Sequence, residues 1–129
     1  MQSFLKNIIV QAGDICLARQ GTLTLKDLAF KARKDLVTEA DRQVEAFIIE
    51  QIQARFPDHG IWGEETGQTF SDSDYCWIID PIDGTTSFFH GQPYYAVSIA
   101  LQKGPEIISG AVYAPSLDQL FQAHKTRGA

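Results

Sequence analysis

One segment of the sequence, from Trp77 to Phe88, combines residues that could carry out chemistry. An apolar run leads directly into Asp80, and Asp83 follows three residues later. Carboxylates at the end of a buried strand would point into a cleft and lie close together. Two negative charges at such a short distance repel each other unless a cation lies between them. Oxygen ligands suit hard divalent ions such as Mg²⁺ or Mn²⁺. The segment therefore predicts a divalent-cation site.

The residues after these acids predict an anion site beside the cation. Gly84 permits a sharp turn, and Thr85 and Thr86 can open a helix or tight turn whose amides and hydroxyls would face a ligand. A metal next to an anion site is what hydrolysis of a phosphate ester needs. The alternative is that Asp-Pro and Asp-Gly are simply turn formers, although the whole set after a buried strand is more specific than either dipeptide.

Three further acids could belong to the same site. Glu64 and Glu65 follow a short candidate strand, where adjacent carboxylates usually form a solvated corner. In company with Asp80 and Asp83 they could add a ligand and a water-orienting acid. Asp41 is expected in the first turn of a helix, so a capping and dipole role competes with a catalytic one.

Two helices are expected to precede the strands that position these residues. Apolar residues at helical spacing predict a first helix over residues 4–20. Thr38 is expected to cap a second helix, which Pro57 ends. Residues 21–34 between them are expected to be an exposed connection.

Short apolar runs after the second helix predict strands. They comprise residues 61–62, 75–79, 96–101, 107–113 and 119–123. The run at 75–79 is consistent with a strand buried on both faces, and Pro81 is expected to end its ladder. Helices followed by closely connected strands indicate an α+β fold, with two N-terminal helices packed on a largely antiparallel sheet.

Composition and charge narrow the classes of function. Hydrophobic residues make up 44% and charged residues 21%, as in a single globular domain. The formal net charge of −5 argues against a broad surface for nucleic acid or anionic membrane. No stretch approaches the roughly 20 apolar residues of a membrane helix, and the N-terminus lacks a signal-peptide core. We therefore expect a cytoplasmic protein.

The cysteines and histidines predict no second site. Cys16 and Cys76 match no metal or redox spacing, so buried free thiols are expected. His59, His90 and His124 are dispersed and are expected at the surface or in structural roles.

Four segments, in this order, resemble the inositol monophosphatase family of magnesium-dependent, lithium-sensitive phosphatases. They are DLVTEAD (35–41), GEE (63–65), WIIDPIDGTTSF (77–88) and HGQPYYAVSIAL (90–101). The resemblance implies the layered αβαβα fold shared by inositol monophosphatase and fructose bisphosphatase. Residues 1–129 would form a single domain, the N-terminal half of that fold.

The resemblance also implies the ligands of the metal. The carboxylates of Glu64, Asp80 and Asp83 and the backbone carbonyl of Ile82 would hold two or three Mg²⁺ ions, and Mn²⁺ could replace them. Ser87 stands where the family more often has asparagine, which leaves these ligands intact.

The remaining roles follow from the same resemblance. Glu65 would orient a water on the metal, and Thr85 with Asp41 would activate the attacking water. The amides of Gly84 and Thr85, with Thr86 nearby, would hold the substrate phosphate. Lys31 lies near the position of a family lysine ahead of DLVT, and the residues between them vary within the family.

The motif also bears on the substrate. Relatives that act on 3′-phosphoadenosine phosphate tend to have leucine between the acids and lysine after the first threonine, and fructose bisphosphatases tend to have serines after the glycine. Ile82 and Thr86 resemble the inositol monophosphatase branch, so inositol monophosphate is the favoured substrate. Alternatives are a phosphatase for another monoester, such as histidinol phosphate, and a non-catalytic metal- or protein-binding module.

The resemblance covers only part of the family pattern. The family's later motif WDxAAG, whose aspartate is a metal ligand, is missing, and the chain has about half the usual length. We therefore expect a truncated form with weak or absent turnover and an exposed face that favours self-association. A homodimer is expected by analogy.

Overall fold

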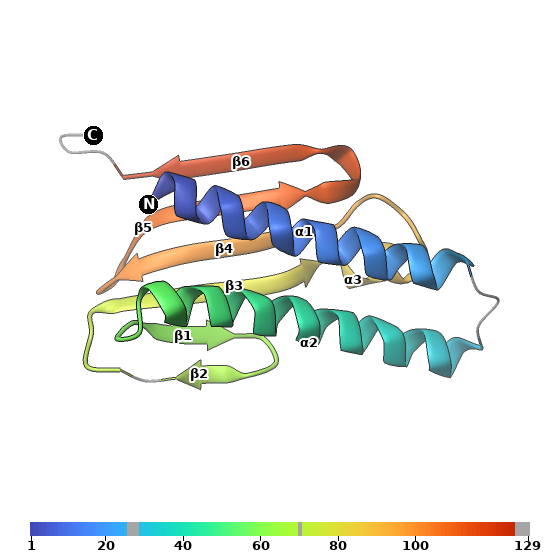
Figure 1. Ribbon diagram of the computed structural model, residues 1–129, viewed down its shortest axis with the longest axis horizontal. Coiled ribbons are helices and arrows are strands. Elements are labelled where there is room, and N and C mark those ends of the chain that lie inside the picture. Colours follow the sequence, from blue (N-terminus) through green and yellow to red (C-terminus); the bar gives the residue numbers. More distant parts are fainter. Residues whose placement is uncertain (26–28, 70, 126–129) are drawn as a thin grey trace.

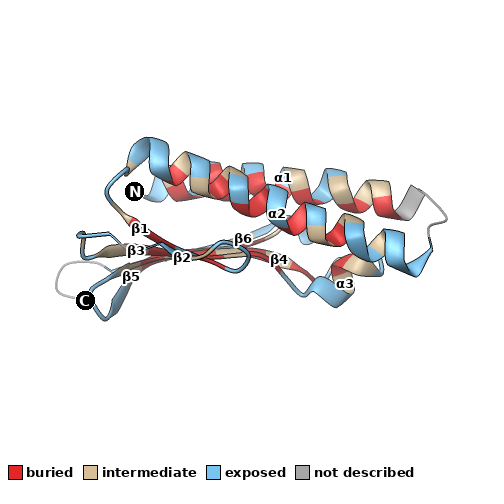
Figure 2. Ribbon diagram, turned by 90° about the horizontal axis from the view of Figure 1, so that it is seen from below, coloured by how far each residue is buried: buried red, intermediate tan, exposed pale blue. Residues whose placement is uncertain are grey.

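Two long helices cover one face of a sheet in the computed structural model, which describes residues 1–25, 29–69 and 71–125. They are α1 (Gln2–Leu25) and α2 (Phe30–Arg55), and they lie side by side. Figure 2 shows the helices and the sheet as two layers, with nothing from the described residues against the far face of the sheet. Neither of these helices, nor the short one, has the apolar length to cross a membrane.

The sheet has six strands in the order β2-β1-β3-β4-β5-β6 (Figure 1). Only β1 and β3 pair in parallel among the described strands, and the other pairs are antiparallel. The predicted fold class, two N-terminal helices on a largely antiparallel sheet, is therefore confirmed. The strands are β1 (Gly60–Gly63), β2 (Gly67–Thr69), β3 (Tyr75–Asp83), β4 (Ala96–Lys103), β5 (Glu106–Ala114) and β6 (Gln119–His124).

Two short turns of helix interrupt the strands. The helix α3 (Thr85–Phe89) follows β3, as the sequence predicted for Thr85, and the 3₁₀ turn η1 (Pro115–Leu117) separates β5 from β6. The strand β2 was not predicted, because its three residues, Gly67 to Thr69, show no apolar alternation.

The core lies between the helices and the inner face of the sheet. In β3, Trp77 and Ile79 face the helices and are buried, whereas Cys76 and Ile78 point to the far side and are half-buried. The expectation that this strand is buried on both faces is therefore wrong, because helices cover only one face of the sheet. The largest fully buried apolar side chains of this layer include Leu5, Ile9, Ile48, Ile52, Trp77 and Ile99.

Both helices are longer than predicted. The first continues to Leu25 and the second begins at Phe30, so the expected exposed connection is wrong outside residues 26–28, which lie outside the described residues. The helix extends because alanine, lysine and arginine favour it and because Arg33 anchors it. The Arg33 guanidinium donates from Nε to the carbonyl oxygen of Phe89 at 2.7 Å and lies 5.4 Å from the Phe89 ring centroid.

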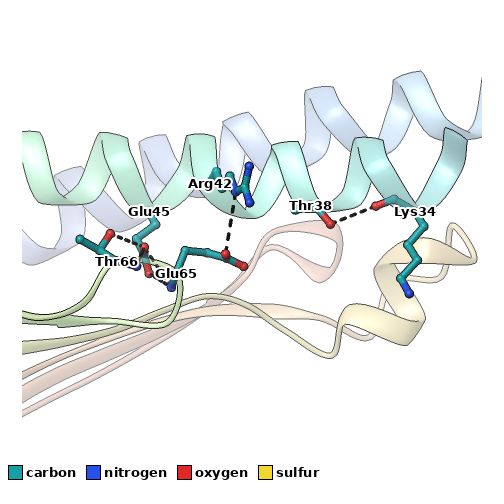
Figure 3. A network of polar contacts seen from close by, with 6 residues as sticks. All are labelled: Lys34, Thr38, Arg42, Glu45, Glu65 and Thr66. Carbon is teal, nitrogen blue, oxygen red and sulfur yellow. Dashed lines mark hydrogen bonds and ion pairs between the residues drawn. The ribbon is translucent and has the colours of Figure 1, made fainter. Parts of the chain in front are cut away.

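Thr38 consequently lies inside α2, and its predicted capping role is wrong. Its hydroxyl donates to the carbonyl oxygen of Lys34 at 3.2 Å, as threonines in helix interiors do (Figure 3). Asp41 is also removed from the first turn, so the capping and dipole interpretation of that residue fails as well.

Pro81 does not end the ladder of β3, which continues to Asp83. Asp80 pairs with Ser98 and Asp83 pairs with Ala96, so the register shifts between these two pairs. Three steps along β3 oppose two along β4, which is the geometry of a β-bulge. Proline lacks an N–H group and is tolerated where ladder pairing is interrupted in this way.

Candidate active site

The parallel pairing of β1 with β3 brings Glu64 beside Asp80. Gly63 at the end of β1 pairs with Ile79 of β3, so Glu64, which follows β1, comes to lie beside Asp80 of β3. The two carboxyls lie close enough to influence each other's protonation. Residues that are 16 positions apart in the sequence thus meet, as a shared site requires.

The β-bulge places Asp83 on the same side as Asp80. In a regular strand, residues three apart point to opposite faces, and the extra residue of a bulge restores them to one face. Both acids line a cavity of about 420 Å³. Its other walls include Glu64, Ile82, Gly84 and Thr85.

Gly84 forms the sharp turn that was predicted after Asp83. Its φ is +91°, in the left-handed region, and a Cβ atom there would lie 2.6 Å from the carbonyl oxygen of Tyr94. Only glycine fits this close approach. The turn leads into α3, where the Thr85 hydroxyl donates to the carbonyl oxygen of Ile82 at 3.2 Å. That carbonyl keeps a second lone pair for another partner.

Asp41 reaches the same region from α2. Its side chain is buried, and its Oδ1 atom has no hydrogen-bond partner among the described residues. Burial, followed by the charges of Glu64, Glu65 and Asp80, raises the pKa of the Asp41 carboxyl to about 7. A second cavity of about 320 Å³ is lined by Asp41 together with Thr85 and Thr86.

The carboxylates have the chemistry that a hard divalent cation requires. Asp80 Oδ1, like Asp41 Oδ1, is buried with no partner in the described part of the chain. Burial also raises the pKa of both Glu64 and Asp80. Two carboxylates this close repel each other unless a proton or a cation lies between them. The donor set therefore fits Mg²⁺ or Mn²⁺.

The ligand set of Glu64, Asp80, Asp83 and the Ile82 carbonyl stays a prediction. Over residues 1–25, 29–69 and 71–125, no three Asp, Glu, His or Cys side chains already gather closely enough to hold a metal ion. The structure brings these residues to one cavity without completing a coordination shell.

Glu65 and Lys31 lie differently from the other predicted residues. The Glu65 side chain faces Arg42, with 3.9 Å between Oε2 and Nε (Figure 3). Lys31 is exposed and lines neither cavity. Lys34, three residues later, lines the smaller cavity instead and points toward α3.

Glu45 is a residue of this region that the sequence interpretation missed. It lies one turn after Asp41 on α2, is only 2% exposed, and accepts hydrogen bonds from Glu65 and Thr66 (Figure 3). The sequence signal for Glu45 was its position four residues after Asp41, between the apolar Val44 and Ile48. A charged residue on a buried helix face needs partners.

The cysteines and histidines lie largely as expected. Cys16 is buried and free, and burial raises the pKa of its thiol to about 12. Cys76 is free but only half-buried. His59 and His124 have structural contacts, with Trp77 and Ser109 respectively, and His90 is exposed. His90 nevertheless lines the smaller cavity.

Comparison with known proteins agrees with these features. The model of the inositol monophosphatase family matches residues 2–129. The chain is 38% identical over 134 residues to an inositol-1-monophosphatase of Rhizobium meliloti, covering 99% of this chain and 50% of the relative. It is 44% identical over 120 residues to a histidinol-phosphatase of Chlorobaculum parvum, covering 92% and 46%.

A solved structure shows the same arrangement of helices and strands. The extragenic suppressor protein suhB from Bartonella henselae is similar with a TM-score of 0.83 at 34% identity, over 98% of this chain and 48% of that protein. The chain spans about half the length of the relatives that it matches. On its motifs, its fold and these similarities, the chain belongs to the inositol monophosphatase family.

Proposed function

We propose that this protein hydrolyses a small-molecule phosphate monoester in a Mg²⁺-dependent reaction. The observation that carries the proposal is the gathering of Glu64, Asp80 and Asp83 at one cavity by the parallel β1–β3 register and the β3 bulge. The Oδ1 atom of Asp80 is buried without a hydrogen-bond partner in the described part of the chain, and a bound cation would give it one.

Glu64, Asp80, Asp83 and the Ile82 carbonyl would hold the cation at the larger cavity. Bound Mg²⁺ would supply a lowered water pKa and neutralise charge on the phosphate and the leaving oxygen. The turn at Gly84, with Thr85 and Thr86, would bind the phosphate oxygens through its amides and hydroxyls. The turn requires glycine at position 84, since φ is +91° and a side chain there would clash with the Tyr94 carbonyl oxygen.

Asp41 and Thr85 are proposed to take up the proton of the attacking water. Both line the smaller cavity, and Thr85 lines the larger one as well, so Thr85 borders both cavities. A general base works best when its pKa lies near the operating pH, and burial, the largest cause, raises the pKa of Asp41 above the ordinary carboxyl value. Glu65 would orient the same water from the turn that follows β1.

Inositol monophosphate is the proposed substrate. The residues Ile82 and Thr86 within the motif support it, and so does a relative named as an inositol-1-monophosphatase. A relative named as a histidinol-phosphatase has comparable identity, so histidinol phosphate is the second candidate. Both are monoesters, and the same acids would serve either one.

The test is phosphate release by the purified chain from inositol 1-phosphate and from histidinol phosphate. Because the chain spans about half the length of its relatives, we expect weak Mg²⁺-dependent release, suppressed by Li⁺, with inositol 1-phosphate the better substrate. The matched control is Asp83→Asn, which removes one proposed ligand while keeping its size. Release that is independent of Mg²⁺, or unchanged in Asp83→Asn, would contradict the proposal. Cation uptake by a folded chain that releases no phosphate would favour a metal-binding module or an incomplete half of the catalytic fold.

A further inference from the structure

Glu45 is a buried carboxylate for which the proposed reaction has no use. Its Oε2 atom accepts hydrogen bonds from the Thr66 backbone N–H at 2.9 Å and from the Thr66 hydroxyl at 2.7 Å. The Glu65 N–H donates to both carboxylate oxygens, at 3.1 Å and 3.2 Å. Figure 3 shows these bonds converging from the turn after β1 onto one side chain of α2. A carboxylate, which only accepts, matches such a set of donors.

The turn held by Glu45 is the one that carries Glu64. The anchored amides belong to the two residues that directly follow Glu64 in the chain. Fixing them fixes the backbone from which the Glu64 side chain projects toward Asp80. Bonds to an ionised acceptor are stronger than neutral ones, so this anchor is suited to hold one backbone geometry.

Gly63 provides an independent sign of the same contact. A Cβ atom at Gly63 would lie 2.6 Å from Glu45 Oε1 and 2.7 Å from its Cδ atom. The carboxylate therefore packs directly against the last residue of β1, where no side chain fits beside it. The end of β1, the turn and α2 thus meet at this one carboxylate.

We propose that Glu45 is a positioning residue, which holds the turn after β1 so that Glu64 can share a divalent cation with Asp80. The cation itself rests on the proposed function. A purely structural Glu45 would affect the stability of the chain and leave the cation affinity of the folded protein unchanged. Loss of outer groups that orient metal ligands typically lowers metal affinity by about 10–100-fold.

The experiment measures Mn²⁺ affinity by calorimetry and by electron paramagnetic resonance, well below the melting temperature of each variant. Glu45→Gln keeps the size but turns an amide N–H₂ group toward backbone donors, so we expect Mn²⁺ affinity to fall by about 10–100-fold. Thr66→Val removes only the bond from the hydroxyl, so its Mn²⁺ affinity should fall less. Thr66→Ser keeps the hydroxyl, so its Mn²⁺ affinity should fall least. Glu50→Gln is the matched control, because Glu50 lies exposed on the same helix.

A second variant guards against poor folding of Glu45→Gln. Gly63→Ala keeps the Glu45 carboxylate but forces it away from β1. This variant should therefore also weaken Mn²⁺ binding. Unchanged affinity in folded Glu45→Gln and Gly63→Ala would overturn the inference alone. Wild-type chain that binds Mn²⁺ but releases phosphate at the same rate without any divalent cation would overturn the proposed function alone. Wild-type chain that binds no Mn²⁺ would overturn the inference together with the metal part of the proposed function.

Discussion

The two ends of β3 differ in whether their buried polar groups have hydrogen-bond partners. Near its start, the Trp77 indole N–H donates to His59 Nδ1 at 2.9 Å. The His59 ring stacks between Phe56 and Tyr75, with centroids 4.7 Å away on each side. Toward the other end of the strand, Asp80 Oδ1 is buried without a hydrogen-bond partner in the described chain. It lies near the Glu64 carboxyl, whose pKa is raised by burial.

This difference separates a region built for stability from one built for binding. Buried polar groups are nearly always paired, and unpaired ones concentrate at functional sites. In the His59 cluster the buried Trp77 N–H has its acceptor, whereas the acid cluster keeps a desolvation cost that a cation would remove. Variants in the first region should therefore change stability, and variants in the second should change function.

The largest effect is expected from Asp83→Asn. Removal of a ligand carboxylate should abolish Mg²⁺-dependent phosphate release, since even the loss of an outer-shell partner costs about 10–100-fold. The fold should persist, because Asp83 is exposed at the cavity wall. Phosphate assays together with circular dichroism check both statements, and full activity in the variant would remove Asp83 from the ligand set.

Thr85→Ala should come next. Loss of a group that helps to move a proton typically costs about 10²–10⁴-fold, so kcat should fall by about that much with a modest change in KM. Steady-state kinetics with inositol 1-phosphate measure the two constants separately. A change confined to KM would contradict a role in water activation and indicate phosphate binding alone.

At the other end of the strand, His59→Leu should act on stability. The Trp77 N–H would lose its acceptor, and a buried donor left unsatisfied costs about 1–3 kcal/mol. Urea unfolding should show this loss, while Mn²⁺ affinity stays at the wild-type value. Weakened Mn²⁺ binding in folded His59→Leu would break the separation between the two regions.

The smallest effect is a pH dependence from the same histidine. Burial lowers the pKa of His59 below its ordinary value of 6.5. Below pH 6.5 the unfolded chain takes up a proton that the folded His59 resists, so stability is full above that pH and falls as the pH drops toward the folded pKa. Melting temperatures of wild type and His59→Leu between pH 7.5 and about 5.5 test this, because their difference should shrink with acid. A constant difference would argue against it.

The acids of the site were predictable because their signals are local. A buried strand that runs into Asp80, a glycine at the turn and threonines after it are neighbours in the sequence, and their spacing indicates the chemistry. The two helices and most strands follow from apolar periodicity for the same reason. Their ends did not follow, since Arg33 extends α2 through a contact with Phe89, 56 positions later.

Features that depend on distant pairing could not be predicted in this way. The parallel register that joins Gly63 to Ile79 and the bulge opposite β4 arise from partners elsewhere in the chain. Glu45 went unnoticed because its importance lies in donors about 20 residues away. Lys31, chosen from resemblance alone, lies on the exposed side of α2.

The most direct test of the account is a Mg²⁺ titration by calorimetry of the wild-type chain and of Asp80→Asn, each followed by thermal unfolding. We expect saturable Mg²⁺ uptake and a raised melting temperature in the wild type, and neither in the variant. We also expect metal-free Asp80→Asn to melt at a higher temperature than metal-free wild type, because a buried carboxyl crowded by other acids has been removed. No Mg²⁺ uptake by the wild type, or equal uptake by both proteins, would contradict the central claim.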